Sequence, residues 1–143
     1  MVLKFEYLPR VGPAGIEYDP TVDVVFTNPK NGASVEARCL IDSGASSIVL
    51  NGEFAEVLGI DLRTGKEHKF QGIKGDPAVG YDHLLNMRLK QDTNEFLVEC
   101  SLVPELKTTG LLGQKGFFEN YRVVFERAKK RIELTPLSPA KKG

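Results

Sequence analysis

This 143-residue chain has no excess of positive or negative charge, no long apolar runs and only two cysteines. Its 19 basic and 19 acidic residues give no net charge, which removes the general electrostatic attraction to nucleic acid or to an anionic membrane. The longest apolar runs, such as 39–41 and 47–50, have the length of strands and are far too short to cross a bilayer. We therefore expect neither nucleic acid nor a membrane as a partner.

The N-terminus has no secretory signal pattern, because Lys4, Glu6 and Arg10 interrupt its apolar residues. Only Cys39 and Cys100 are present, and each lies in an apolar, strand-like run. Two cysteines do not form a disulfide framework, and their spacing indicates neither a metal site nor redox chemistry. We interpret both as buried, reduced thiols of a cytoplasmic protein, and we expect no cofactor and no metal.

The remaining composition is that of an ordinary globular domain, with 41% hydrophobic and 27% charged residues. The length fits a single domain over residues 1–143. Hydrophobic residues alternate with a period of two along most of the chain, which is typical of strands with one buried face. This pattern predicts an all-β domain with its core at about 21–134 and a frayed tail at 136–143.

Turn residues divide the alternating pattern into hairpins. The segment 28–32, Asn-Pro-Lys-Asn-Gly, joins the first two strands, and a Gly-rich tip at 72–75 joins two later ones. For contact with another chain, either the last strand or the N-terminal segment offers a free edge. The expected strands are 21–27, 34–41, 47–50, 67–71, 79–89, 95–103, 122–125 and 131–134, with short helices at 53–58 and 116–121.

One acidic residue stands out by its position. Asp42 directly follows the apolar run 39–41, at the end of a strand that we expect to be buried. Burying a carboxylate is costly unless it is hydrogen-bonded, paired or protonated. Ser43 adds a hydroxyl beside it, and Gly44 allows a turn that brings backbone N–H groups toward it. Asp-Ser-Gly also forms Asx turns and helix caps in unrelated proteins, so the tripeptide alone leaves a structural role open.

Three motifs in a fixed order make the pattern more specific. Residues 40–50 contain an apolar pair, Asp-Ser-Gly-Ala and then a strand, while 110–113 is Gly-Leu-Leu-Gly, followed by two phenylalanines at 117–118. The Gly-rich tip at 72–75 lies between them. Together they resemble the active-site loop, second signature and flap of the retropepsins, the retroviral-type aspartic peptidases and their cellular relatives. The resemblance runs from about 21 to 134.

The resemblance implies a retropepsin-like closed β-barrel with a flap hairpin and one or two short helices. It implies that Asp42 is the catalytic aspartate, supported in its loop by Ser43, Gly44 and Ala45. Ser43 would brace the two active-site loops of a dimer, and Gly44 would contact the substrate backbone. The other implied residues form the substrate-binding flap tip and the second signature beneath the active-site loop, namely Gly72, Ile73, Lys74, Gly75, Leu111, Leu112 and Gly113.

Two features depart from the family pattern. Viral members commonly pair an acidic residue two positions after the active-site glycine with a basic residue after the second signature's glycine. Ser46 and Gln114 occupy these positions here. Because both charges are absent together, neither is left uncompensated, as expected for a cellular relative. Lys74 stands in the flap tip, where a small residue is more usual.

The number of carboxylates determines the expected assembly. Aspartic proteolysis needs two carboxylates that share one proton, and this chain has a single Asp-Ser-Gly. The second Asp42 must then come from another copy related by a two-fold axis, giving a homodimeric endopeptidase that acts on a peptide or protein substrate. The alternative is a retropepsin fold used for dimerisation or peptide binding, with weak or no proteolysis.

Overall fold

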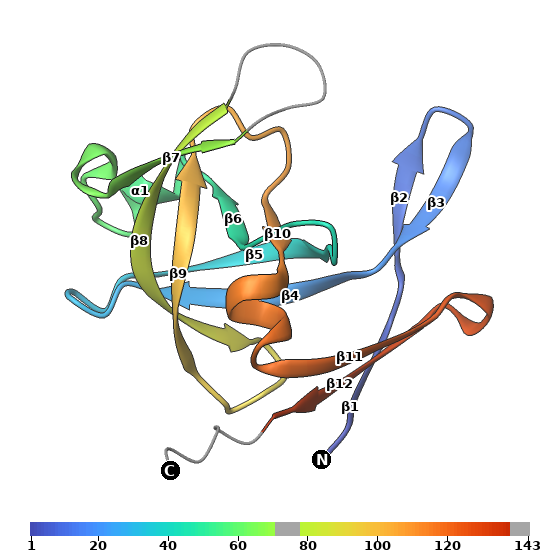
Figure 1. The fold of residues 1–143 in the computed structure, drawn as a ribbon. Helices are drawn as coiled ribbons and strands as arrows, with labels where there is room; N and C mark the ends of the chain where they lie inside the picture. The colour runs from blue at the N-terminus through green and yellow to red at the C-terminus, as the bar shows by residue number, and fades with distance from the viewer. Residues whose placement is uncertain (71–77, 138–143) are drawn as a thin grey trace.

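The computed structural model describes residues 1–70 and 78–137, and strands make up most of it (Figure 1). Two of them, β4 (Thr21–Thr27) and β5 (Ser34–Ile41), have the bounds that the alternating pattern predicts. Along both strands the buried side chains recur at every second position, so that one face of each strand turns into the core. The two strands pair as the expected antiparallel hairpin.

Six strands close into a barrel in the order β4-β5-β10-β6-β9-β8, and a further pairing between β8 and β4 completes the ring. The interior is filled by buried aliphatic and aromatic side chains from all six strands. The strands besides β4 and β5 are β6 (Ile48–Asn51), β8 (Ala78–Leu89), β9 (Phe96–Val103) and β10 (Gly110–Leu112). The predicted all-β closed barrel is therefore confirmed.

Helical segments are short. The helix expected at 53–58 is present as α1 (Phe54–Val57), and a 3₁₀ turn, η1 (Leu62–Thr64), follows it. The helix expected at 116–121 was misplaced. It is η2 (Gln114–Phe118), which is kinked because Gly116 has a φ of +95°. No helix among the residues described is both long and apolar enough to span a membrane.

The two ends of the described chain meet in a separate three-stranded sheet. Its order is β1 (Leu3–Glu6), β12 (Arg131–Pro136) and β11 (Tyr121–Glu126), with the 3₁₀ turn η3 (Arg127–Lys129) between β11 and β12. The last strand is thus the middle of this sheet, because β1 covers one of its edges, so the first of the two expected free edges is wrong. The other alternative, the N-terminal segment, contains β1, which stands at an end of this sheet. Residues 138–143 of the expected tail lie outside the described residues.

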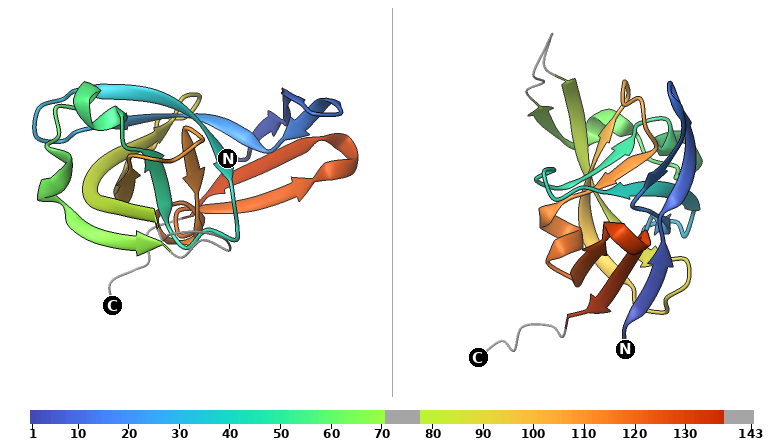
Figure 2. Two further views of the ribbon diagram at one scale, coloured as in Figure 1. Left: turned by 90° about the horizontal axis from the view of Figure 1, so that it is seen from above. Right: turned by 90° about the vertical axis from the view of Figure 1, so that its right-hand side faces the viewer.

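Between β1 and β4 a two-stranded hairpin projects from the barrel, and we call it the arm (residues 8–19). It consists of β2 (Leu8–Gly12) and β3 (Gly15–Asp19), which pair with each other and with no other described strand. Figures 1 and 2 show the arm and the β11–β12 hairpin projecting from the same side of the barrel. The sequence analysis assigned no strands to this segment.

A buried carboxylate ties the barrel to the terminal sheet. Asp92, in the turn between β8 and β9, is 5% exposed and accepts a hydrogen bond from the hydroxyl of Tyr121 in β11 at 2.8 Å. The side-chain amide of Asn94 and the backbone N–H of Thr93 also donate to it. Burial acts to raise the pKa of Asp92, but these hydrogen bonds outweigh it and the pKa is lowered below its ordinary value.

Candidate active site

Asp42 directly follows β5, and the alternation of that strand determines where its carboxylate points. Cys39 and Ile41 turn into the barrel and are buried, so Leu40 and Asp42 share the outer face. Asp42 is accordingly half-buried.

The loop after Asp42 folds back on the carboxylate. The backbone N–H of Gly44 donates to Oδ1 of Asp42 at 2.9 Å, and the N–H of Ala45 donates to the carbonyl oxygen of Asp42 at 3.1 Å. Ser43 and Gly44 are exposed, and Ala45 is half-buried. The side-chain bond is that of an Asx turn, so the local geometry alone does not distinguish a structural aspartate from a catalytic one.

The second signature passes directly beneath this loop. In β10, Leu111 and Leu112 pair in parallel with β5, and the N–H of Asp42 donates to the carbonyl oxygen of Leu112 at 3.0 Å. A Cβ at Gly113 would lie 2.5 Å from the carbonyl oxygen of Ala45 and closer still to that of Ser47. Only glycine leaves enough room for the two segments to pass at this distance.

A neutral side chain anchors the loop that follows Asp42. The side-chain amide of Gln114 donates to the carbonyl oxygen of Ser43 at 2.8 Å. The backbone N–H groups of Gln114 and Lys115 donate to the carbonyl oxygens of Ala45 and Ser46, at 2.9 Å and 3.0 Å. The sequence showed that both charges were missing, but it did not reveal that the Gln114 amide bonds to the loop.

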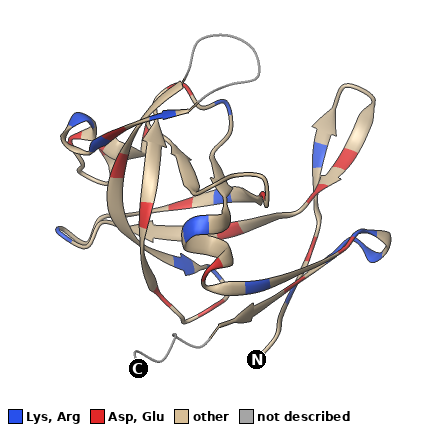
Figure 3. Ribbon diagram, viewed as in Figure 1, with Lys and Arg blue, Asp and Glu red and all other residues tan. Residues whose placement is uncertain are grey.

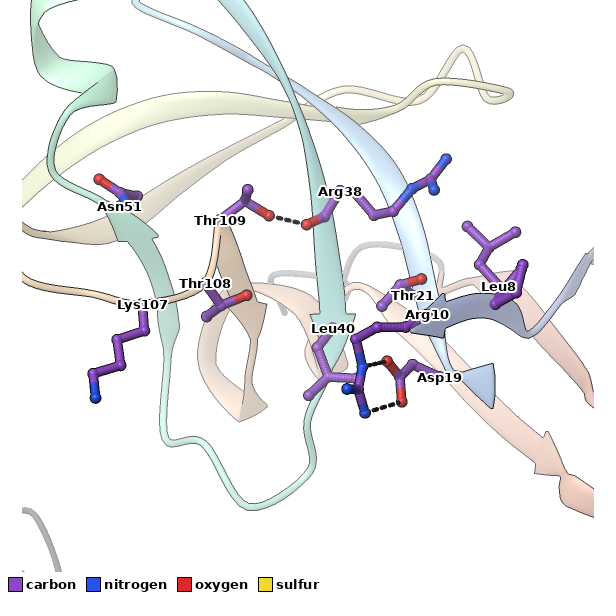
Figure 4. A pocket seen from close by; sticks show the side chains of 11 residues that line it. Leu8, Arg10, Asp19, Thr21, Arg38, Leu40, Asn51, Lys107, Thr108 and Thr109 are labelled. Atoms are coloured by element: carbon purple, nitrogen blue, oxygen red, sulfur yellow. Dashed lines mark hydrogen bonds and ion pairs between the residues drawn. The ribbon is translucent and has the colours of Figure 1, made fainter. Parts of the chain in front are cut away.

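A cavity of about 680 Å³ opens on the outer face of β5 (Figure 4). Leu40 lines it, and Leu40 lies two residues before Asp42 on the same face, about 7 Å along the strand. The sequence analysis missed this cavity, although the outward position of Leu40 was contained in the strand pattern. The remaining lining residues come from the arm, β4, β5, β6 and the segment before β10, namely Leu8, Pro9, Arg10, Asp19, Thr21, Arg38, Asn51, Lys107, Thr108 and Thr109.

The two thiols are structural, as predicted. Cys39 and Cys100 are buried and are not joined in a disulfide. Burial raises the pKa of Cys39 to about 12 and also raises that of Cys100. Both sulfurs therefore stay protonated at neutral pH and have little nucleophilic reactivity.

The hairpin expected to carry the flap is present, since β7 (Lys66–Phe70) pairs in antiparallel with the first part of β8. The four residues expected at its tip, Gly72, Ile73, Lys74 and Gly75, lie outside the described residues.

A family model and one solved structure agree with this architecture. The family model described as gag-polyprotein putative aspartyl protease matches residues 30–118. A retropepsin-like aspartic protease from Rickettsia conorii superposes with a TM-score of 0.62 at 18% sequence identity, over 94% of this chain and 91% of that one. The EIAV protease complexed with the inhibitor HBY-793 aligns over 68% of this chain and 84% of that one, at 19% identity and a TM-score of 0.47. The search of curated proteins found no match.

Proposed function

Because this chain belongs to the gag-polyprotein putative aspartyl protease family, we propose that it is an aspartic endopeptidase that acts as a symmetric homodimer. In this proposal each subunit contributes one Asp42, and the two carboxylates meet across the two-fold axis. The substrate is a peptide or protein segment bound between the subunits.

The observation that carries the proposal is the position of Asp42. Its carboxylate lies on the outer face of the barrel, at the end of a rigid strand, and the backbone N–H of Gly44 bonds to one of its oxygens. An outward carboxylate can meet the same residue of a second subunit, whereas one enclosed in the core could not. The hydrogen bonds to Leu112 and from Gln114 also hold the loop from below, which supports the proposal because a catalytic group needs a firmly held loop.

The reaction follows from two equivalent carboxylates that share one proton. The ionised Asp42 takes a proton from a water molecule, and the resulting hydroxide attacks the peptide carbonyl carbon. The protonated Asp42 of the other subunit donates its proton to the carbonyl oxygen, which stabilises the tetrahedral intermediate. The intermediate then collapses: the C–N bond breaks as the proton held by the first carboxylate passes to the leaving amine nitrogen, and the second carboxylate takes back a proton from one of the two hydroxyls. The products are a carboxylic acid and an amine, and the carboxylate pair again shares one proton.

The neighbouring residues have supporting roles in this mechanism. We assign the exposed hydroxyl of Ser43 to bracing the two active-site loops across the dimer axis, and the backbone of Gly44 to contact with the substrate main chain. The cavity beside Leu40 is large enough to receive a substrate side chain on the same face as Asp42. A cytoplasmic location agrees with two free, buried thiols.

The test is a cleavage assay with a diverse peptide library, with and without the aspartic-protease inhibitor pepstatin. Asp42→Asn keeps the shape of the side chain but removes the base and the shared proton, so cleavage should be lost while the melting temperature changes little. Asp61→Asn is the matched control, because Asp61 is exposed and makes no side-chain cap bond to the turn that follows it. Cleavage by purified Asp42→Asn protein at the parent rate would show that the assignment is wrong.

A further inference from the structure

A second cavity, of about 170 Å³, lies on the same outer face of the barrel as Asp42. One row of paired residues crosses this face from β5 to β8, and its members are Leu40, Leu111, Val49, Ser101 and Asp82. Side chains that pair directly across strands point to the same side of a sheet, so the whole row shares the side of Leu40. Ser101 and Asp82, at the far end of the row, line the cavity.

The cavity lies within reach of a peptide bound at Asp42. Continued by one residue, the two ladders of β10 place Gly113 between Asp42 and Ser47. Two strand spacings of about 4.8 Å each therefore put Ser47, which lines the cavity, about 10 Å from Asp42. An extended peptide advances about 3.3 Å per residue, so the cavity meets a side chain about three residues from the scissile bond. Ser46 and Lys115 also line it and are exposed, so that it opens to solvent.

Two polar groups at this cavity lack a hydrogen-bond partner among the described residues. The first is the hydroxyl oxygen of Ser47, which is fully enclosed. The second belongs to Asp82, whose side chain is 9% exposed. Its Oδ1 accepts a hydrogen bond from the hydroxyl of Ser101 and lies 3.4 Å from Nδ1 of His68, whereas its Oδ2 bonds to no residue that the structure describes. Because an enclosed polar atom without a partner is costly, both oxygens favour the arrival of a hydrogen-bond donor.

The charges around the cavity favour a cation. Asp82 and Glu99 bring two carboxylates, Lys115 brings one ammonium group, and His68 is charged only when it is protonated. Figure 3 shows acidic residues on the neighbouring strands β8 and β9 and a basic residue on η2. With His68 neutral, the walls carry one net negative charge. The volume equals that of about five or six water molecules in the liquid, which is enough for the head of a basic side chain.

We propose that this cavity is a substrate subsite that selects a basic side chain about three residues from the scissile bond, with Asp82 and Ser47 as specificity-determining residues. The inference rests on the proposed function, because it needs a peptide bound over Asp42. The substrate cation donates to Oδ2 of Asp82 and to the hydroxyl of Ser47, and the exposed Glu99 adds attraction at the mouth. A symmetric dimer carries two such subsites, one on each side of the scissile bond.

The test starts from a peptide that the protein cleaves, taken from the library assay. Each residue within about four positions of the cleaved bond is replaced in turn by lysine, glutamine or glutamate, and kcat/KM is measured for every peptide. At a position about three residues from the bond, the parent protein should prefer lysine to glutamate by about 10- to 100-fold, with glutamine between them.

Two variants then remove the groups that the proposal assigns. Asp82→Asn and Ser47→Ala should each lower the ratio of kcat/KM between the lysine and glutamate peptides, by about tenfold for the first and about threefold for the second. Glu67→Gln is the matched control, because Glu67 is exposed on the face of β7 opposite to His68, and the ratio should not change. Ser47→Ala breaks no side-chain hydrogen bond to a described residue, so it tests the subsite even if the melting temperature of Asp82→Asn is low.

Failure of the subsite and failure of the proposed function give different results. Equal cleavage of the lysine and glutamate peptides at every position would overturn the subsite and leave the homodimeric protease intact. A lysine preference that is unchanged in Ser47→Ala and in folded Asp82→Asn protein would do the same, because other residues would then select the side chain. No cleavage of any peptide, or cleavage that survives Asp42→Asn, would refute the proposed function itself.

Discussion

Gly113→Ala tests whether the second signature really passes beneath the active-site loop. The added Cβ would lie 2.5 Å from the carbonyl oxygen of Ala45, 2.8 Å from its carbonyl carbon and nearer still to the carbonyl oxygen of Ser47. These are backbone atoms, so no side chain can rotate away. Restoring ordinary contact requires the loop and β10 to separate by about 1 Å, which weakens the dispersion contacts on both sides.

That displacement should lower both the stability of the protein and its activity. Overpacking of this kind costs about 1–3 kcal/mol in the free energy of unfolding, which urea denaturation measures. A shift of about 1 Å in the loop that carries Asp42 should also lower kcat/KM by about 100-fold in a peptide assay. Gly12→Ala is the control, because its Cβ meets only the end of the flexible Glu17 side chain. A Gly113→Ala protein with parental stability and activity would refute the close passage of the two segments.

Two further substitutions test the polar network and the working pH. Tyr121→Phe removes a hydrogen bond to the buried Asp92 carboxylate and should lower stability by about 1.5–3 kcal/mol at pH 7. Because the folded pKa of Asp92 is lowered, its stabilisation is present above the unfolded pKa of about 3.9 and is lost as the pH falls through the folded value. The difference between parent and variant should therefore shrink on acidification, and a constant difference from pH 7 to about pH 2 would contradict this account. Ala45 cannot donate a hydrogen bond to the ionised carboxylate pair, so we expect an optimum of about pH 5 to 7. Ala45→Ser should move the basic limb of the pH–rate profile downward, and an unchanged limb would show that residue 45 does not set it.

The sequence was most informative where local chemistry alone determines structure. The bounds of β4 and β5 could be predicted because both strands alternate strictly and a strong turn lies between them. The family could be recognised from three motifs in order, and the match of residues 30–118 to the family model confirms it. The assignment of Asp42 and the loop after it as the active site rests on the same motifs and stays a prediction.

Contacts between segments far apart in the chain could not be predicted from local sequence patterns. The arm was missed because Pro9, Gly12, Pro13 and Gly15 are typical of turns, although Pro9, Gly12 and Gly15 lie within its two short strands. The parallel pairing of β10 with β5 joins residues about 70 positions apart, and no local pattern reports such a partner. The last strand has no free edge on the side where the N-terminal strand β1 pairs with it, and no local pattern predicted β1.

The central claim, that two chains share one active site through Asp42, can be tested by mixing subunits. A fixed amount of parent protein is equilibrated with a threefold excess of Asp42→Asn chains, at a concentration where both dimerise, and peptide cleavage is measured. Random pairing leaves about a quarter of the parent chains with a parent partner, so cleavage should fall to about a quarter of its starting rate. An equal mass of an unrelated protein should leave the rate unchanged. A rate that is also unaffected by the excess Asp42→Asn chains would contradict the shared site, because each parent chain would then be active on its own.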